Sequence, residues 1–232
     1  MGFSDSHHFR KMVAGVCMVL GPLCALAAFI VSPAMHTKTA AQMASFAGHP
    51  DRALISTLLS LAAVGFVIVA TLGLMHMLRE RMVGYGHAGG AMALVGLMLA
   101  MASFGAGMLM WAMVKDGVQA SDVTAVHKLT HAGASMIPLY ILPWLSAVGY
   151  VVLAAGLYRA RAVDWWMAAM IAVGMILLNL SGPMASIAVG IIGSAIFLVG
   201  LGSIGMMVLR ESDADWEHTP EYRGLRPAAG MS

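Results

Sequence analysis

Two histidines four residues apart are the clearest sign of possible chemistry in this chain. His127 and His131 share one face of a predicted helix, the spacing at which two imidazoles bind one metal ion. His36 and His49 fall in an earlier polar segment that we expect on the same side of the molecule. Lys128 stands where zinc proteases of the HExxH type have their catalytic glutamate. A metal site formed by these four histidines is one interpretation; solvated polar residues at helix ends are the other, which the missing glutamate favours.

A segment with two prolines is the best candidate for a ligand pocket. Pro138 and Pro143 each remove a backbone donor and free the carbonyl four residues earlier. In an apolar helix such carbonyls need another partner or must line a polar cavity. The residues predicted to line this pocket are Ser135, Pro138, Tyr140, Pro143 and Trp144. A packing kink without a ligand is the alternative.

No resident cofactor is predicted, although two are worth testing beside the histidine site. His76 and His87 flank a short loop and are the pair that would hold a haem axially. A thioether cluster at Met108, Met110 and Met113 suggests Cu(I). Methionine is equally dense elsewhere among its 22 occurrences, which favours core packing.

Six apolar runs must position these residues. They cover 12–32, 53–78, 88–114, 129–158, 165–180 and 187–209, and no Asp, Glu, Lys or Arg lies inside any of them. About 20 apolar residues in a helix cross a hydrocarbon layer of roughly 30 Å. The chain is 60% hydrophobic and 10% charged, with a mean hydropathy of +0.84. The sequence therefore predicts an all-α membrane protein with six spans in antiparallel hairpins.

The positions of Lys and Arg predict the orientation of these spans. One side carries Arg10, Lys11, Arg79, Arg81, Arg159, Arg161 and Arg210, and the other carries Lys38, Arg52, Lys115 and Lys128. Since the cytoplasmic side holds the excess of basic residues, both termini are predicted to be cytoplasmic in the cell (inner) membrane. We expect a transmembrane domain at 1–210 and a polar tail at 211–232. The net charge of +2 gives no reason to expect a nucleic-acid partner.

The first external loop contains a helix of its own. Thr39 and Gln42 have the spacing of a capping box, and Gly48 marks the helix end. Met43 and Phe46 fall on one face, which is typical of a helix lying on the membrane surface.

Small and polar residues in the last two runs predict helix contacts. Ser186, Gly190 and Ser194 repeat every four residues, with Gly202 further along. Small residues let another backbone approach closely, so this face should pack on a helix of the bundle or of another subunit. Asn179 is the only carboxamide in the apolar runs and should hydrogen-bond to a neighbouring helix.

Three segments of the first half, 49–52, 73–81 and 89–96, resemble a family of uncharacterised six-helix bacterial membrane proteins. The resemblance implies six spans and a bacterial cell membrane. It implies no activity, cofactor or site.

Three functions remain open at this point. The first is a non-catalytic accessory or scaffold subunit of a larger membrane complex, which the absence of charge in the spans favours. The second is a membrane redox or metal-binding protein that uses the histidines. The third is a transporter or channel for a neutral or lipophilic solute. The expected partners are the lipid bilayer and other membrane subunits or further copies of the chain.

Reporter fusions test the predicted orientation. Fusions after Arg81 and Arg161 should report a cytoplasmic location, and fusions near Thr39 and Ser121 an external one, because of the bias in basic residues. Opposite readings at any two of these positions would contradict the topology.

Overall fold

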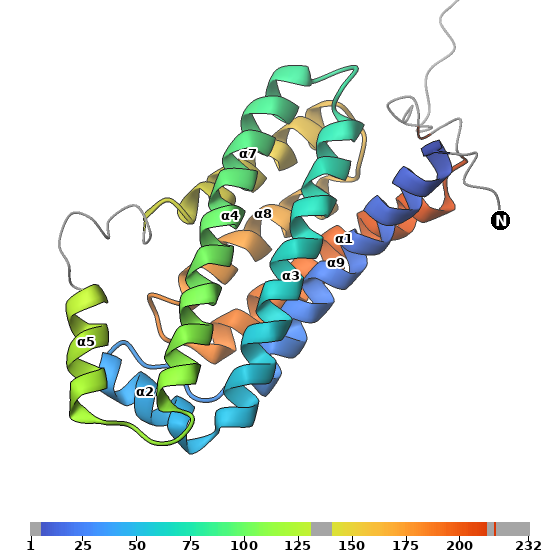
Figure 1. Cartoon of the computed structure of the whole chain (residues 1–232). Helices are drawn as coiled ribbons and strands as arrows, with labels where there is room; N and C mark the ends of the chain where they lie inside the picture. The colour runs from blue at the N-terminus through green and yellow to red at the C-terminus, as the bar shows by residue number, and fades with distance from the viewer. Residues whose placement is uncertain (1–5, 131–140, 213–215, 217–232) are drawn as a thin grey trace, which may run out of the picture.

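The protein is all-helical in the part that the structure, a computed structural model, describes: residues 6–130, 141–212 and 216. Eight helices and no strand occur there (Figure 1). They are α1 (Ser6–Val31), α2 (Thr39–Gly48), α3 (Pro50–Met77), α4 (Val83–Val114), α5 (Ala120–Thr130), α7 (Trp144–Arg159), α8 (Trp165–Ser181) and α9 (Ile187–Arg210). The prediction of an all-α chain is confirmed.

Four of these helices, α1, α3, α4 and α9, are long and apolar enough to cross a membrane. The helices α7 and α8 are also apolar but have only 16 and 17 residues. At 1.5 Å per residue they reach about 24–26 Å, somewhat less than a typical hydrocarbon layer. A membrane protein is therefore supported by four helices.

The fourth predicted run, 129–158, does not form one helix. The helix α5 ends at Thr130, residues 142 and 143 form a turn, and α7 begins at Trp144. Pro143 occupies the N-cap of α7. A proline has no N–H to continue a preceding helix, and its ring collides with the turn before it, so a new helix starts here instead. Residues 131–140 lie outside the described part of the chain.

The six apolar helices form a closed ring in which each helix packs on two others. The order around the ring is α1, α3, α4, α7, α8, α9 and back to α1. Neighbours in the ring contact start to end: Gly190 near the start of α9 meets Phe29 near the end of α1, and Gly205 near the end of α9 meets Gly15 near the start of α1. In the same way Gly89 and Gly96 of α4 meet Leu153 and Ser146 of α7. Every neighbour is therefore antiparallel, and Figure 1 shows the first and last helices side by side.

Glycines bring the helix backbones into contact around the ring. A Cβ on Gly149 of α7 would collide with the backbone of Ala93 in α4, and a Cβ on Gly96 would collide with that of Ser146. Between α8 and α9, a Cβ on Gly174 would lie 2.7 Å from the Cα of Phe197. Only a residue without a side chain fits at these three positions.

Large side chains fill the centre of the ring. Tyr150 of α7 is fully buried, and its hydroxyl lies 2.9 Å from the Thr71 hydroxyl of α3. Its ring meets Phe197 of α9 edge to face at a centroid distance of 5.3 Å. Three helices of the ring thus converge on one tyrosine.

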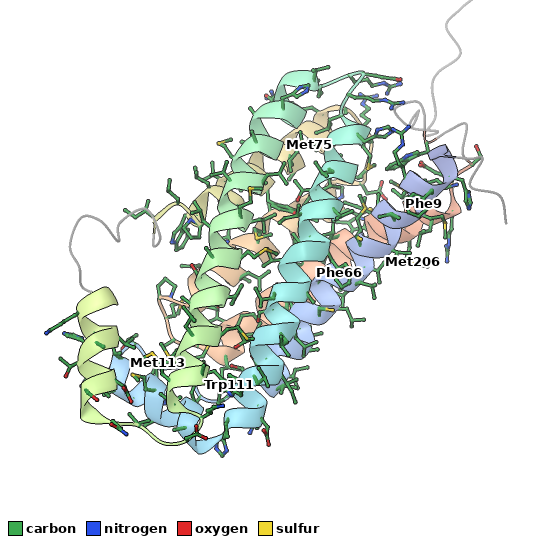
Figure 2. The ribbon with its side chains drawn as sticks, viewed as in Figure 1. Phe9, Phe66, Met75, Trp111, Met113 and Met206 are labelled. Atoms are coloured by element: carbon green, nitrogen blue, oxygen red, sulfur yellow. The ribbon has the colours of Figure 1, made fainter. Side chains whose placement is uncertain are left out.

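A small second core closes one end of the bundle, called here the α2–α5 end. Met43 of α2, Val114 of α4 and Val126 of α5 pack together. The apolar face of α2 thus packs on α4 and α5. The position of α2 at a membrane surface stays a prediction. Trp111 ties the same end of α4 to α3 by donating to the Pro50 carbonyl at 2.9 Å (Figure 2).

The start of α2 also differs from the prediction. Lys38 is the N-cap and provides no side-chain cap, and Thr39 is already the first helical residue. The Gln42 side chain reaches back to accept a hydrogen bond from the His36 N–H at 2.7 Å. The predicted capping box is therefore wrong, because Gln42 caps the loop before the helix. The predicted end at Gly48 is confirmed.

The backbone contact between α4 and α7 can be tested with matched glycine variants. Gly149→Ala should lower the free energy of unfolding by about 1–3 kcal/mol, since the added methyl group meets backbone that cannot move aside. Gly105→Ala on α4 is the control, because a Cβ there meets nothing within 4 Å. It should be neutral or stabilise the helix by up to about 1 kcal/mol. Denaturant titration in detergent, followed by circular dichroism, measures both; equal effects would contradict the packing.

Candidate functional site

The described histidines of the predicted metal site lie at the α2–α5 end. His36 precedes α2, His49 follows it and His127 lies on α5, which packs against α2. All three side chains are exposed. Among the described residues, no three His, Cys, Asp or Glu side chains are grouped so that they could hold a metal ion. His131 lies outside that part, so the four-histidine site stays a prediction.

The predicted proline pocket falls mostly outside the described residues, which exclude Ser135, Pro138 and Tyr140. Pro143 and Trp144 are half-buried at the start of α7. The Pro143 carbonyl accepts hydrogen bonds from the Ser146 N–H at 2.9 Å and from the Ser146 hydroxyl at 2.6 Å. This carbonyl is therefore satisfied within the first turn of α7, and the pocket stays a prediction.

The small residues that were predicted to share one face of α9 lie in different surroundings. Ser186 is the N-cap and accepts from the Val189 N–H at 3.3 Å. Gly190 lies against the ring of Phe29 in α1, and Ser194 is fully buried and donates to the Gly190 carbonyl at 2.7 Å. At Gly202 a Cβ would meet only Leu198 of its own helix, at 3.5 Å.

The helical repeat explains this separation. A helix turns by about 100° per residue, so each four-residue step drifts by about 40° and the eight residues from Ser194 to Gly202 by about 80°. Gly202 consequently leaves the face that Gly190 presents to α1.

Two polar contacts join helices inside the ring. The Asn179 side-chain amide of α8 donates to the Ser146 hydroxyl of α7 at 3.1 Å, the interhelical bond predicted for this residue. The pairing of Thr71 with Tyr150 was not predicted. Only their polarity within apolar runs could have signalled it, since the two residues are far apart in sequence.

At the opposite end of the bundle, called here the tail end, Trp216 contacts α3. Its ring stacks on His76 with centroids 4.8 Å apart. The His76 Nδ1 accepts from Arg79 at 3.2 Å, and the Nε2 then donates to the Trp216 carbonyl at 3.2 Å. Both ring nitrogens of His76 are thus hydrogen-bonded, including the one that would have to bind the haem iron. His87 is exposed and contacts the Val83 carbonyl of its own helix at 3.0 Å.

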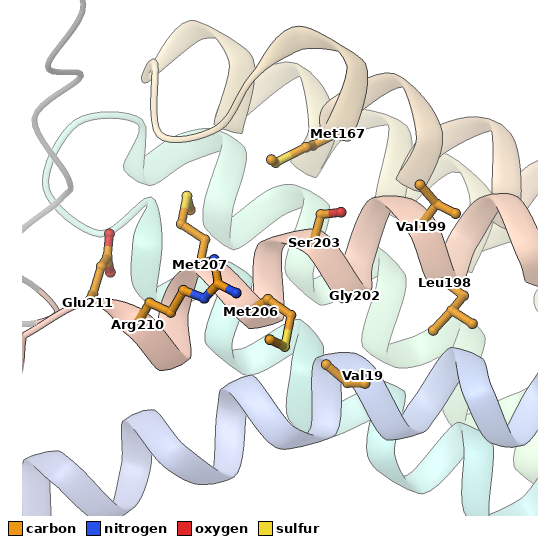
Figure 3. Close-up of a pocket in the computed structure, with 10 residues that line it drawn as sticks. All are labelled: Val19, Met167, Leu198, Val199, Gly202, Ser203, Met206, Met207, Arg210 and Glu211. Carbon is orange, nitrogen blue, oxygen red and sulfur yellow. The ribbon is translucent and has the colours of Figure 1, made fainter.

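An open groove runs along α9 toward the tail end, between α1 and α8 (Figure 3). Its volume is about 770 Å³, within the range of roughly 300–1,000 Å³ of small-molecule sites. It is lined by Val19, Met167, Leu198, Val199, Gly202, Ser203, Met206, Met207, Arg210 and Glu211. The sequence analysis did not predict this groove. The adjacent small residues Gly202 and Ser203 could have indicated it, because they leave space beside a helix.

Comparison of the chain with protein-family models, with curated proteins and with solved structures found no match. The class that the fold supports is thus a helical protein with four helices of membrane-spanning length.

A double-mutant cycle tests the polar contact between α7 and α8. Ser146→Ala and Asn179→Ala should each destabilise the protein, and their coupling energy should be about 0.6 kcal/mol, as for other hydrogen bonds between membrane helices. Unfolding in detergent micelles provides the four free energies. Additive effects of the two substitutions would show that the contact contributes nothing.

Proposed function

We propose that the chain is a six-span membrane protein with both termini cytoplasmic, and that it serves as a non-catalytic accessory or scaffold subunit of a larger complex. The ring supports six spans, because α7 and α8 fill the space between α4 and α9. Both are apolar throughout most of their length. Their shortness is compatible with local thinning of the bilayer.

One observation carries the scaffold proposal: within the described residues one half of α4 contains no buried residue, and it is called here the uncovered half. From Met98 to Met113, about four turns, no residue of α4 is buried. The helix is also the least buried of the four long ones. The first half of α4 instead packs closely on α7, where Gly89 and Gly96 lie against the α7 backbone.

The uncovered half of α4 has the composition of a helix interface. Ala102, Ser103, Gly105 and Ala106 are small and lie at least partly exposed among large apolar neighbours. Lipid gives no hydrophobic drive for helix association, so membrane helices associate where small residues permit close contact. A helix of another subunit is the occupant that we propose for this face.

The filled ring centre also favours a structural role over a solute pathway through the bundle. Tyr150, Phe197 and Leu74 are all essentially inaccessible to solvent there. A transporter would need to part these side chains to admit a solute.

Co-purification tests the proposed function. The tagged protein, extracted in mild detergent, should recover a stoichiometric membrane partner. The double variant Ala102→Leu/Ala106→Leu should recover at least about tenfold less, because two leucines block close approach at the α4 face. Ala169→Leu, at an exposed position of α8, is the matched control and should recover as much as the original protein.

The same purification separates the alternatives. Recovery without a stoichiometric partner or self-association would contradict the scaffold role. A visible absorption band or a bound metal ion would favour the redox alternative instead.

A further inference from the structure

The groove on α9 is open because two small residues form its floor. A Cβ added at Gly202 would meet only the Leu198 side chain, at 3.5 Å, and Ser203 is half-buried. One turn away, at Gly205, a Cβ would lie 2.7 Å from the Gly15 carbonyl oxygen of α1. The side of α9 at Gly205 thus packs on α1, whereas the side at Gly202 and Ser203 borders the groove.

The walls of the groove are apolar and adaptable. Val19 of α1 and Met167 of α8 stand on either side of α9 in Figure 3, and Leu198 and Val199 close the end away from the tail. Met206 projects into the open part and is 44% exposed. Unbranched methionines adjust to flexible chains, so these walls suit a hydrocarbon tail better than a rigid polar ligand.

Arg210 places a positive charge at the other end of the groove. Arg210, the last residue of α9, is exposed and has no hydrogen bond or ion pair within the part of the chain that the structure describes. In Figure 3 its guanidinium extends toward Met206, whereas the Glu211 carboxylate points away from it. The buried Lys11 of α1 donates to the Glu211 carbonyl at 2.9 Å, which places a second cation beside this acidic residue of the groove.

We infer that this groove binds one anionic phospholipid, with an acyl chain along Gly202 and Ser203 and the phosphate at Arg210. A planar guanidinium pairs with a phosphate through two parallel hydrogen bonds. The inference rests on the membrane location proposed above, in which Arg210 lies at the cytoplasmic surface, where anionic lipids and basic residues meet. The charge at one end and the hydrocarbon walls along the rest match both parts of such a lipid.

Native mass spectrometry of the full chain from nanodiscs tests this site. In an equal mixture of phosphatidylglycerol and phosphatidylcholine, the protein should retain one phosphatidylglycerol preferentially. Arg210→Gln should lower this preference about fivefold, the effect of one basic residue at an anionic surface. Gly202→Leu should lower retention of both lipids, because the side chain fills the groove without meeting a neighbouring helix.

Two controls locate the effect. Arg161→Gln removes an exposed cation that does not line the groove, and Val173→Leu enlarges an exposed apolar residue of α8 outside it. Both should retain lipid like the original protein. If Arg161→Gln is as damaging as Arg210→Gln, or if Arg210→Gln changes nothing, the proposed site is wrong. Displacement of the lipid by inorganic phosphate alone would also overturn it, since the acyl chain would then contribute nothing.

The readouts separate this inference from the proposed location. If the protein does not enter bilayers, and alkaline washing removes it from membranes, the membrane location itself fails. If it enters bilayers and folds normally but shows no lipid preference, only the lipid site fails.

Discussion

Close approach of helix backbones is the constraint on which the rest of this structure depends. Among lipid tails an apolar side chain gains little by leaving one neighbour for another, so helices associate through tight packing and hydrogen bonds. Gly149 against Ala93 and Gly174 against Phe197 show how this is achieved. Each glycine removes the side chain that would hold two helices apart, and dispersion contacts along the whole helix follow. The closed ring is the sum of such contacts.

The polar residues of the ring reinforce this packing without charge. Thr71 with Tyr150 and Ser146 with Asn179 are neutral pairs that join α3 to α7 and α7 to α8. A neutral pair loses less on leaving water than an ion pair does, which suits an interior surrounded by hydrocarbon. Because the described interior is filled, the sites that we propose for other molecules lie on the outer surface.

Two parts of that outer surface are unlike the rest. In the part of the chain that the structure describes, one half of α4, from Met98 to Met113, contains no buried residue. The α9 groove arises where Gly202 and Ser203 lie between Val19 of α1 and Met167 of α8. The first is rich in small residues, which fits a helix. The second is concave and ends in a cation, which fits a lipid.

The sequence by itself determined that the apolar runs are helical, because such a run must satisfy its backbone hydrogen bonds within a helix, but it did not determine the break before Trp144. It also identified Gly48 as a helix end and Asn179 as an interhelical donor. Only the tertiary structure decided which faces meet. Gly190 packs on Phe29 while Gly202 opens a groove, and Trp216 reaches His76 across 140 residues. Spacing along one chain specifies a helix and its faces, whereas a contact or a groove depends on what a distant segment brings to that face.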